Sequence, residues 1–278
     1  MLTPAQLDRY RRDGFLVLDG FVDRAACDAL RARAGELIAA WEPGDQRTVF
    51  TTDEQARKTD DYFLDSGDEI RFFFEEGALD GDGRLTCPKE RAINKIGHAL
   101  HDLDPVFEAF SRTPALAALV EALGLAEPQL MQSMYICKQP LIGGEVRCHQ
   151  DSTYLHTEPE AMVGLWFALE DARLDNGCLW AIPGGHRDGL RARFVRDGRT
   201  TRLDVLDPRP WDEAALVPLE VHRGDLIILD GRVPHMSHMN RSPASRHAYT
   251  LHVVSGRSVY PDTNWLRRRS PARGFLGG

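Results

Sequence analysis

"GDLIILDGRVPH" (residues 224–235) is a short apolar run, followed by an Asp-Gly pair and then by a histidine. Four consecutive aliphatic residues between turn-forming residues are typical of a buried strand. Pro234 has no backbone N–H to donate to a sheet, so it marks a strand end or a sheet edge. We therefore expect a strand that ends at His235 and presents this imidazole at the rim of a sheet.

The surrounding sequence repeats this pattern of short β-rich runs separated by glycine, proline, asparagine and aspartate. The runs are QLMQSMYICKQP (129–140), EVRCHQDSTYL (145–155), MVGLWFALED (162–171), GCLWAIPGG (177–185) and RHAYTLHVVSG (246–256). A series of short strands and turns predicts a β-sandwich or a barrel.

The first half of the chain reads differently. Thr3 is placed to cap a helix, with Pro4 in its first turn and Gln6 completing a capping box. Apolar residues at helical spacing predict further helices at 23–43, 93–112 and 113–125, and an exposed, partly irregular segment at 53–90 around a buried strand IRFFFE. The predicted fold is mainly β with flanking helices, in one domain (1–278) whose helical N-terminal half packs on a C-terminal β-core.

Composition limits the classes of partner. The chain has 278 residues, of which 42% are hydrophobic, so it has enough apolar surface for one large core. The net charge of −8 argues against nucleic acid as a partner, because a phosphate backbone requires a basic surface. Five scattered cysteines favour reduced thiols. With no signal peptide and no apolar run near 18 residues, we expect a cytoplasmic protein with no membrane partner, and a loosely ordered arginine-rich end (267–273).

A metal site is predicted at "EVRCHQDSTYLH" (145–156), where His149 and Asp151 stand one residue apart. Alternate side chains of an extended chain emerge on the same face, so these two are neighbours. With His235 they form two histidines and one carboxylate, the set that binds non-haem iron(II) and leaves open positions on the metal. Arg246 follows His235 and could hold a carboxylate through paired hydrogen bonds, as a 2-oxoglutarate co-substrate requires.

Simpler interpretations remain beside this one. A His-x-Asp pair on a strand is by itself more often an ordinary polar pair. A second such pair, His186 and Asp188, follows the turn PGG, which weakens it as a ligand set. His98 and His101 lie three apart on an expected helix, which is usually a surface or packing arrangement. The remaining candidates for contact with substrate, each with a solvated position as the alternative, are His156, His238 and the arginines of 191–202. His252 could face the barrel interior, with a hydrogen-bonded core histidine as the alternative.

The motifs together resemble one family. With the His-Gln-Asp motif, they resemble the phytanoyl-CoA dioxygenase family, most closely its domain-containing branch, and they cover almost the whole chain. The matching stretches are DGFLVLDGF, DEIRFFFE, INKIGHALH, QSMYICKQP, ALEDARLDNGCLW, IPGGH and GDLIILDGRVPH. The resemblance implies a double-stranded β-helix (a jelly-roll, cupin-like core). It also implies iron(II) on His149, Asp151 and His235. The residues that it implies for 2-oxoglutarate are Lys95, Met134, Trp166, Ser237 and Arg246.

The resemblance also implies a reaction. Such an enzyme uses dioxygen and 2-oxoglutarate to hydroxylate a small organic substrate, here an acyl-CoA, a carboxylic acid or a related metabolite, with release of succinate and CO2. One alternative is a catalytically silent jelly-roll module that only binds 2-oxoglutarate and metal. Another is a cupin-like metal-dependent isomerase or hydrolase, which would not need Arg246. One departure is PGGH at 183–186 where the family usually has Pro-Gly-Ser-His, and it lies in a turn.

Overall fold

A large antiparallel sheet combines strands from the whole length of the chain. In the computed structural model, which describes residues 2–44, 48–49 and 61–275, its strand order is β1-β11-β6-β13-β4-β3-β2, with β14 beside β4. The strands are β1 Phe15–Leu18, β2 Ile70–Phe74, β3 Ile93–His98, β4 Pro128–Ile136, β6 Met162–Ala168, β11 Leu226–Asp230, β13 Ala248–Ser255 and β14 Arg273–Gly274.

A smaller antiparallel sheet packs against the large one. Its order is β10-β7-β12-β5, and a separate hairpin pairs β8 with β9. The strands are β5 Val146–His149, β7 Leu179–Ala181, β8 Ala192–Asp197, β9 Thr200–Val205, β10 Val217–Leu219 and β12 His235–Ser237. Buried side chains from both sheets, Trp166 and Ile227 on one side and Leu179 and Leu219 on the other, form one apolar cluster. The fold is therefore mainly β with flanking helices, as predicted, and is consistent with a jelly-roll core.

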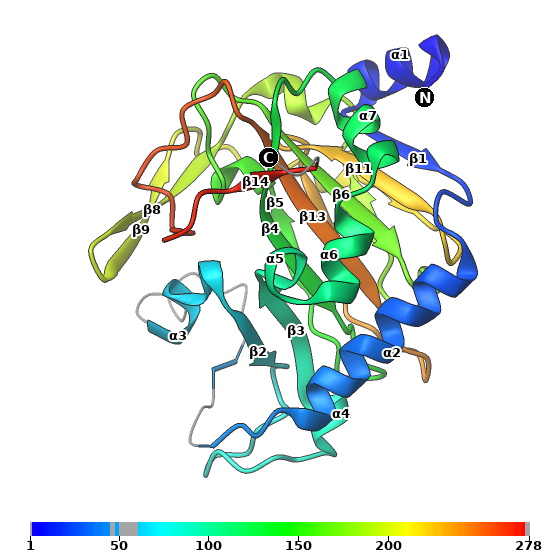
Figure 1. Cartoon of the computed structure of the whole chain (residues 1–278), viewed down its shortest axis with the longest axis vertical. Coiled ribbons are helices and arrows are strands. Elements are labelled where there is room, and N and C mark those ends of the chain that lie inside the picture. The colour runs from blue at the N-terminus through cyan, green and yellow to red at the C-terminus, as the bar shows by residue number, and fades with distance from the viewer. Residues whose placement is uncertain (1, 45–47, 50–60, 276–278) are drawn as a thin grey trace.

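Helices cover the other face of the large sheet (Figure 1). The layer is formed by α2 Arg24–Ala40, α5 Leu100–Leu103, α6 Pro105–Ser111 and α7 Pro114–Ala122. The other helices are α1 Pro4–Asp13, α3 Asp61–Leu64 and α4 Lys89–Ala92, and the 3-10 turns are η1 Ser66–Asp68, η2 Asp151–Thr153, η3 Gly185–Asp188 and η4 Glu213–Ala215. Strand β13 shows how the sheet separates core from site. Tyr249 and Leu251 enter the core under the helices, whereas Thr250 and His252 point to the opposite face.

The predicted capping of the first helix is confirmed. The Thr3 hydroxyl accepts a hydrogen bond from the Gln6 backbone, and the Gln6 side chain accepts one from the Thr3 backbone. Gly14 ends the helix at a φ of 81°, a left-handed conformation that glycine adopts without strain. The next predicted helix is present as α2, which begins after Asp23 and ends at Ala40. Of the segment expected to be exposed and irregular, residues 53–60 lie outside the described residues, and β2 is its predicted buried strand.

The predicted helix at 93–112 is wrong in its first third. Residues 93–98 form β3, which pairs with β2 on one side and β4 on the other. Its apolar residues are compatible with either a buried strand or a helix, and the outcome is decided by the two neighbouring strands, which pair with it along both edges. His98 and His101 therefore do not share a helix face; His98 is on β3 and His101 is on α5.

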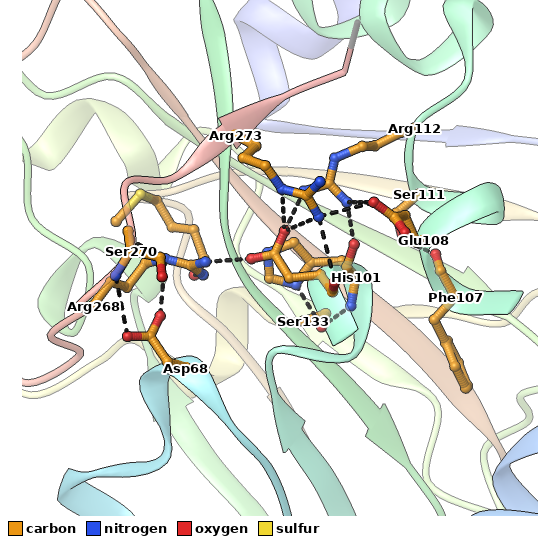
Figure 2. Close-up of polar contacts among 12 residues, drawn as sticks. Asp68, His101, Phe107, Glu108, Ser111, Arg112, Ser133, Arg268, Ser270 and Arg273 are labelled. Atoms are coloured by element: carbon orange, nitrogen blue, oxygen red, sulfur yellow. Dashed lines mark hydrogen bonds and ion pairs between the residues drawn. The ribbon is translucent and has the colours of Figure 1, made fainter. Parts of the chain in front are cut away.

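The arginine-rich end is ordered, contrary to expectation. Figure 2 shows Arg112, Arg268 and Arg273 converging on one acidic group. This group is the Asp102 carboxylate, which forms ion pairs with all three guanidinium groups. The side chains of Asp102 and Arg268 are only 9% and 6% exposed. The segment that carries Arg268 and Arg273 is thus tied to α5 by ion pairs with the buried Asp102 carboxylate, and β14 adds backbone pairing to β4.

Two further expectations concern the thiols and the membrane. All five cysteines are free thiols, as expected for reduced residues. Across the described residues, we find no helix that combines the length and the apolar character needed to span a bilayer.

Candidate active site

Three side chains from the small sheet and the loop after it meet at one point. His149 ends β5, Asp151 opens η2 and His235 opens β12. The Asp151 Oδ1 atom lies 3.5 Å from His149 Nε2 and 3.6 Å from His235 Nε2. One ligand atom from each residue lies within 4.8 Å of the others, a spacing that a single metal ion can bridge.

The local backbone explains this convergence, with two differences from the sequence prediction. Strand β5 ends at His149, so Asp151 is on a 3-10 turn rather than on the strand. Gln150 between them points the other way and donates to the carbonyls of Gly189 and Arg232. His235 does not end the strand of 226–230; it begins a separate strand, β12, directly opposite His149.

Backbone carbonyls fix the tautomers of both histidines. His149 Nδ1 lies 2.8 Å from the carbonyl of Arg147, and His235 Nδ1 lies 3.1 Å from that of Val233. A carbonyl only accepts, so each Nδ1 carries the hydrogen and each Nε2 presents a lone pair to Asp151. Two lone pairs facing a carboxylate repel one another unless a cation lies between them. This donor set therefore fits a divalent metal ion.

The protonation states agree with ligation. Burial lowers the pKa of His235 to about 4, so its imidazole is neutral at pH 7. Burial alone would raise the pKa of the Asp151 carboxyl, but the positive charge that His235 and His252 carry when protonated holds this pKa well below its usual value. Asp151 is therefore an anion. A neutral imidazole and a carboxylate are the forms that bind metal.

His252 supports Asp151 from the large sheet. Its Nε2 atom lies 3.3 Å from Asp151 Oδ2, the oxygen that does not face the other two histidines. Gly164 on β6 makes room for this carboxylate, since a Cβ at that position would be 3.0 Å from Asp151 Oδ2. The carboxylate is therefore held at Oδ2, which leaves Oδ1 directed at His149 and His235.

The three residues open onto a cavity of about 610 Å³. The predicted co-substrate residues Lys95, Met134, Trp166, Ser237 and Arg246 all line this cavity. The Lys95 ammonium is 3.6 Å from the Met134 sulfur. Arg246 is 2% exposed, its guanidinium lies 5.1 Å from the centre of the Trp166 ring, and its Nε donates to the carbonyl of Gly177.

Arg246 is a buried cation with unused hydrogen-bonding capacity. Its Nη1 atom has no hydrogen-bond partner and no carboxylate pairs with it among the described residues. Burial lowers the pKa of this guanidinium to about 10, which leaves it charged at neutral pH. A buried, unpaired cation is costly, so its environment fits a carboxylate ligand. The residues present therefore fit a dicarboxylic 2-oxo acid as well as a metal.

The other histidines have structural contacts. In the described part of the chain, His101, His156, His186 and His238 do not belong to the metal-ligand cluster. Their contacts are with the Ser133 hydroxyl (His101), Glu158 (His156), the carbonyl of Arg11 (His186) and Glu145 (His238). His98 and His252 line the cavity. The arginine-rich segment 191–202 forms the predicted hairpin, β8–β9; Arg191 lines the cavity, and Arg196 is buried against backbone carbonyls.

Sequence reasoning missed two functional candidates. The sequence suggests that His252 faces the interior but does not reveal its contact with Asp151, because that contact depends on how the two sheets pack. Lys138 was not singled out, although it lies just beyond β4 within the motif QSMYICKQP. A lysine at the end of a buried strand is a usable signal, since lysine is rarely buried without a partner.

Comparison with known proteins identifies relatives along nearly the full chain. The family model described as phytanoyl-CoA dioxygenase (PhyH) matches residues 10–248. A phytanoyl-CoA dioxygenase domain-containing protein 1 from Mus musculus is 48% identical, covering 96% of this chain and 95% of the relative. A homolog of that protein from Dictyostelium discoideum is 44% identical, covering 98% and 99%.

Solved structures share the fold at lower identity. EctD from S. alaskensis, crystallised with 2-oxoglutarate and 5-hydroxyectoine, is 22% identical with a TM-score of 0.66, covering 99% of this chain and 87% of that one. The epimerase SnoN, in complex with Fe3+, alpha ketoglutarate and nogalamycin RO, is 16% identical with a TM-score of 0.65, covering 99% and 95%. The family match and the relatives of high identity show that this chain belongs to the phytanoyl-CoA dioxygenase family.

Proposed function

We propose that the protein is an iron(II)- and 2-oxoglutarate-dependent dioxygenase that hydroxylates a small organic substrate and releases succinate and CO2. The observation that carries this proposal is one cavity that contains both the His149, Asp151 and His235 cluster and the unpaired, buried guanidinium of Arg246. Membership of a dioxygenase family supports the enzyme class, and solved neighbours with iron and 2-oxoglutarate support the two cofactors.

Each group has a distinct task in this proposal. Bound iron(II) supplies the activation of dioxygen and the oxidative decarboxylation of the keto acid. His149, Asp151 and His235 would hold the metal, and three protein ligands would leave it open to the co-substrate. Arg246 holds the far carboxylate of 2-oxoglutarate. The apolar cavity walls, including Trp166 and Leu229, keep water from the reacting atoms.

The proposed substrate is an acyl-CoA, a carboxylic acid or a related metabolite. Its support is the cavity lining, where Arg147, Arg191 and Arg209 accompany Asp207, the one acidic lining residue besides Asp151 among the described residues. The Arg191 guanidinium stacks on Trp211 at 3.9 Å, which leaves it in a fixed orientation. An excess of positive charge in a protein of net charge −8 favours an anionic group on the substrate. We further propose a cytoplasmic location without membrane or nucleic-acid partners.

The test is succinate release from 2-oxoglutarate under air, with iron(II), over a panel of acyl-CoAs, free acids and small metabolites. A substrate should raise succinate release well above the substrate-free rate, and Asp151→Ala should abolish it. Tight 2-oxoglutarate binding with no turnover on any substrate would instead support the silent binding module. Unaltered 2-oxoglutarate binding by Arg246→Ala would point to a cupin-like isomerase or hydrolase.

A further inference from the structure

Lys138 is a buried cation in the same corner of the cavity as Arg246. It is 2% exposed, and its ammonium donates to the Ser237 hydroxyl at 2.9 Å and to the carbonyl of Gly144. Both acceptors are neutral. Within the described residues, no carboxylate is close enough to form an ion pair with this ammonium. The hydroxyl of Ser237 and the carbonyl of Gly144 only partly offset the free-energy cost of burying the Lys138 charge, so this part of the cavity favours binding of an additional anion.

The contact with Lys138 determines how Ser237 can act. An ammonium has only hydrogens to give, so the Ser237 oxygen must accept. The single hydrogen of this hydroxyl must then point away from the lysine. Ser237 is 1% exposed and lines the cavity, and the described residues offer that hydrogen no acceptor. The hydroxyl is thus prepared to donate to a ligand.

The backbone holds Lys138 and Arg246 together. The Arg246 N–H donates to the carbonyl of Lys138 at 3.3 Å, and the Arg246 Nε donates to the carbonyl of Gly177 at 3.1 Å. Gly177 has a φ of 84°, and a Cβ there would lie 2.6 Å from Lys138 Cε. The absence of a side chain on Gly177 therefore leaves room for the Lys138 side chain, and the Gly177 carbonyl orients the Arg246 guanidinium.

The buried cations of Lys138 and Arg246 repel each other. Burial first, and then the charge of Arg246, lower the pKa of Lys138 to about 7. The charges of Glu75 and Glu145 raise this pKa and so counter the shift only in part. An incoming carboxylate would relieve the repulsion between the two cations.

We propose that Lys138 is a positioning residue for the distal carboxylate of the co-substrate. It aims the Ser237 hydroxyl hydrogen at that carboxylate and adds a second positive charge beside Arg246. The inference rests on the proposed function, because it concerns a dicarboxylic 2-oxo acid in this cavity. It also predicts selectivity, since a 2-oxo acid without the distal carboxylate gains nothing from Lys138.

The test compares two ligands by calorimetry with the Mn(II)-loaded protein, which needs no turnover. 2-Oxopentanoate has the chain length of 2-oxoglutarate but a methyl group in place of the distal carboxylate. Lys138→Met keeps most of the side-chain volume and removes the charge. It should weaken 2-oxoglutarate binding about tenfold, as expected for loss of one charged hydrogen bond, and leave 2-oxopentanoate binding and Mn(II) affinity unchanged.

Control variants separate this role from a structural one. Lys89→Met removes a lysine that donates to the backbone carbonyls of Ala39 and Trp41, lies 3.9 Å from Glu42 and does not line the cavity, and it should leave both ligands unaffected. In a Ser237→Ala background, Lys138→Met should cost clearly less than in the wild type. Equal weakening of both ligands, or unchanged 2-oxoglutarate binding, would overturn the inference, and additive losses would overturn its route through Ser237. Failure of the wild-type protein to bind 2-oxoglutarate would instead contradict the proposed function.

Discussion

At the scale of single residues, Asp151 is the one anion among the proposed metal ligands. Its Oδ1 faces the Nε2 atoms of His149 and His235, and its Oδ2 faces His252. A cation at this point is therefore balanced by one carboxylate, and the imidazoles contribute lone pairs without charge.

Asp151→Asn keeps the shape of this side chain and removes its charge. We expect the affinity for Mn(II), measured by calorimetry, to fall at least about tenfold, because a neutral amide oxygen is a weaker ligand than a carboxylate. Asp171→Asn is the matched control, since that side chain is 38% exposed and hydrogen-bonds to Arg173 and to the N–H of Arg223. Equal Mn(II) affinity in Asp151→Asn and the wild type would contradict the assignment of this ligand.

Gly164 tests whether the space around Asp151 matters. A methyl group at this position would lie 3.0 Å from Asp151 Oδ2 and 3.7 Å from both His252 and Leu229. Gly164→Ala should therefore displace the carboxylate and weaken Mn(II) binding several-fold. Gly35→Ala is the control, because a Cβ on that glycine of α2 meets nothing within 4 Å, and it should leave Mn(II) binding unchanged and stabilise the helix slightly. If the two variants bind Mn(II) alike, the crowding argument fails.

At the scale of elements, the charge pairs of Asp102 connect α5 to the C-terminal segment. Arg268 and Arg273 come from that segment, and Arg112 comes from the end of α6. The same segment carries Trp265, which lines the cavity and stacks on Phe63 at 4.2 Å. The pairs therefore stabilise one wall of the active site as well as the end of the chain.

Removing Asp102 should be costly because it leaves buried guanidinium groups unpaired. We expect Asp102→Ala to lower the free energy of unfolding by about 3 kcal/mol, the usual range for breaking a buried ion pair. Asp204→Ala removes an exposed partner of Arg202 and should cost under about 1 kcal/mol. Urea unfolding measures both, and a similar small loss in the two variants would show that the Asp102 pairs add little stability.

The same carboxyl predicts a pH dependence. Burial alone would raise the pKa of Asp102, but His101, Arg268 and Arg273 lower it to about 2. In the unfolded chain this pKa is about 3.9. A depressed folded-state pKa means that the stability from ionised Asp102 is fully present above about pH 4 and is lost as the pH falls through about 2. The difference in unfolding free energy between the wild type and Asp102→Asn should shrink over that interval, and a constant difference would refute this linkage.

At the scale of the whole molecule, both proposed ligands bind a site that only the folded chain assembles. His149 lies far from His235 and Arg246 in the sequence, and the three meet through the pairing of β5 with β12 and the packing of the two sheets. Binding to the folded state alone stabilises it by about 2.7 kcal/mol at a ligand concentration of a hundred times Kd. Mn(II) should therefore raise Tm, and 2-oxoglutarate should raise it further when Mn(II) is present. Thermal unfolding of Asp151→Asn should show a much smaller increase, and an equal one would contradict the prediction.

The sequence predicts the mainly β fold, because short β-rich runs between turn residues leave few alternatives. The motifs predict the family, which the comparisons confirm. Segment 93–98 is wrongly predicted as helix because local pattern does not reveal that β2 and β4 flank it. The ordered arginine-rich end is missed for a similar reason, since its acidic partner Asp102 is more than a hundred residues away in the chain.

The proposed metal ligands and Arg246 are recognisable from residue type and order, and the structure brings them to one cavity. The roles of Lys138 and His252 were not predictable in this way. Lys138 depends on a contact with Ser237 across 99 positions of sequence. His252 depends on which face of β13 turns toward the small sheet, and on Gly164 leaving space beside Asp151. Such contacts follow from tertiary packing, which a local pattern does not specify.

The central claim is that one cavity holds a metal ion and a dicarboxylic 2-oxo acid side by side. A crystal structure of the protein with Mn(II) and 2-oxoglutarate, with anomalous scattering to locate the metal, tests this most directly. We predict a single anomalous peak bonded to His149 Nε2, Asp151 Oδ1 and His235 Nε2, with the distal carboxylate of 2-oxoglutarate on Arg246 and Ser237. A metal peak elsewhere, or a co-substrate that does not contact Arg246, would contradict the account.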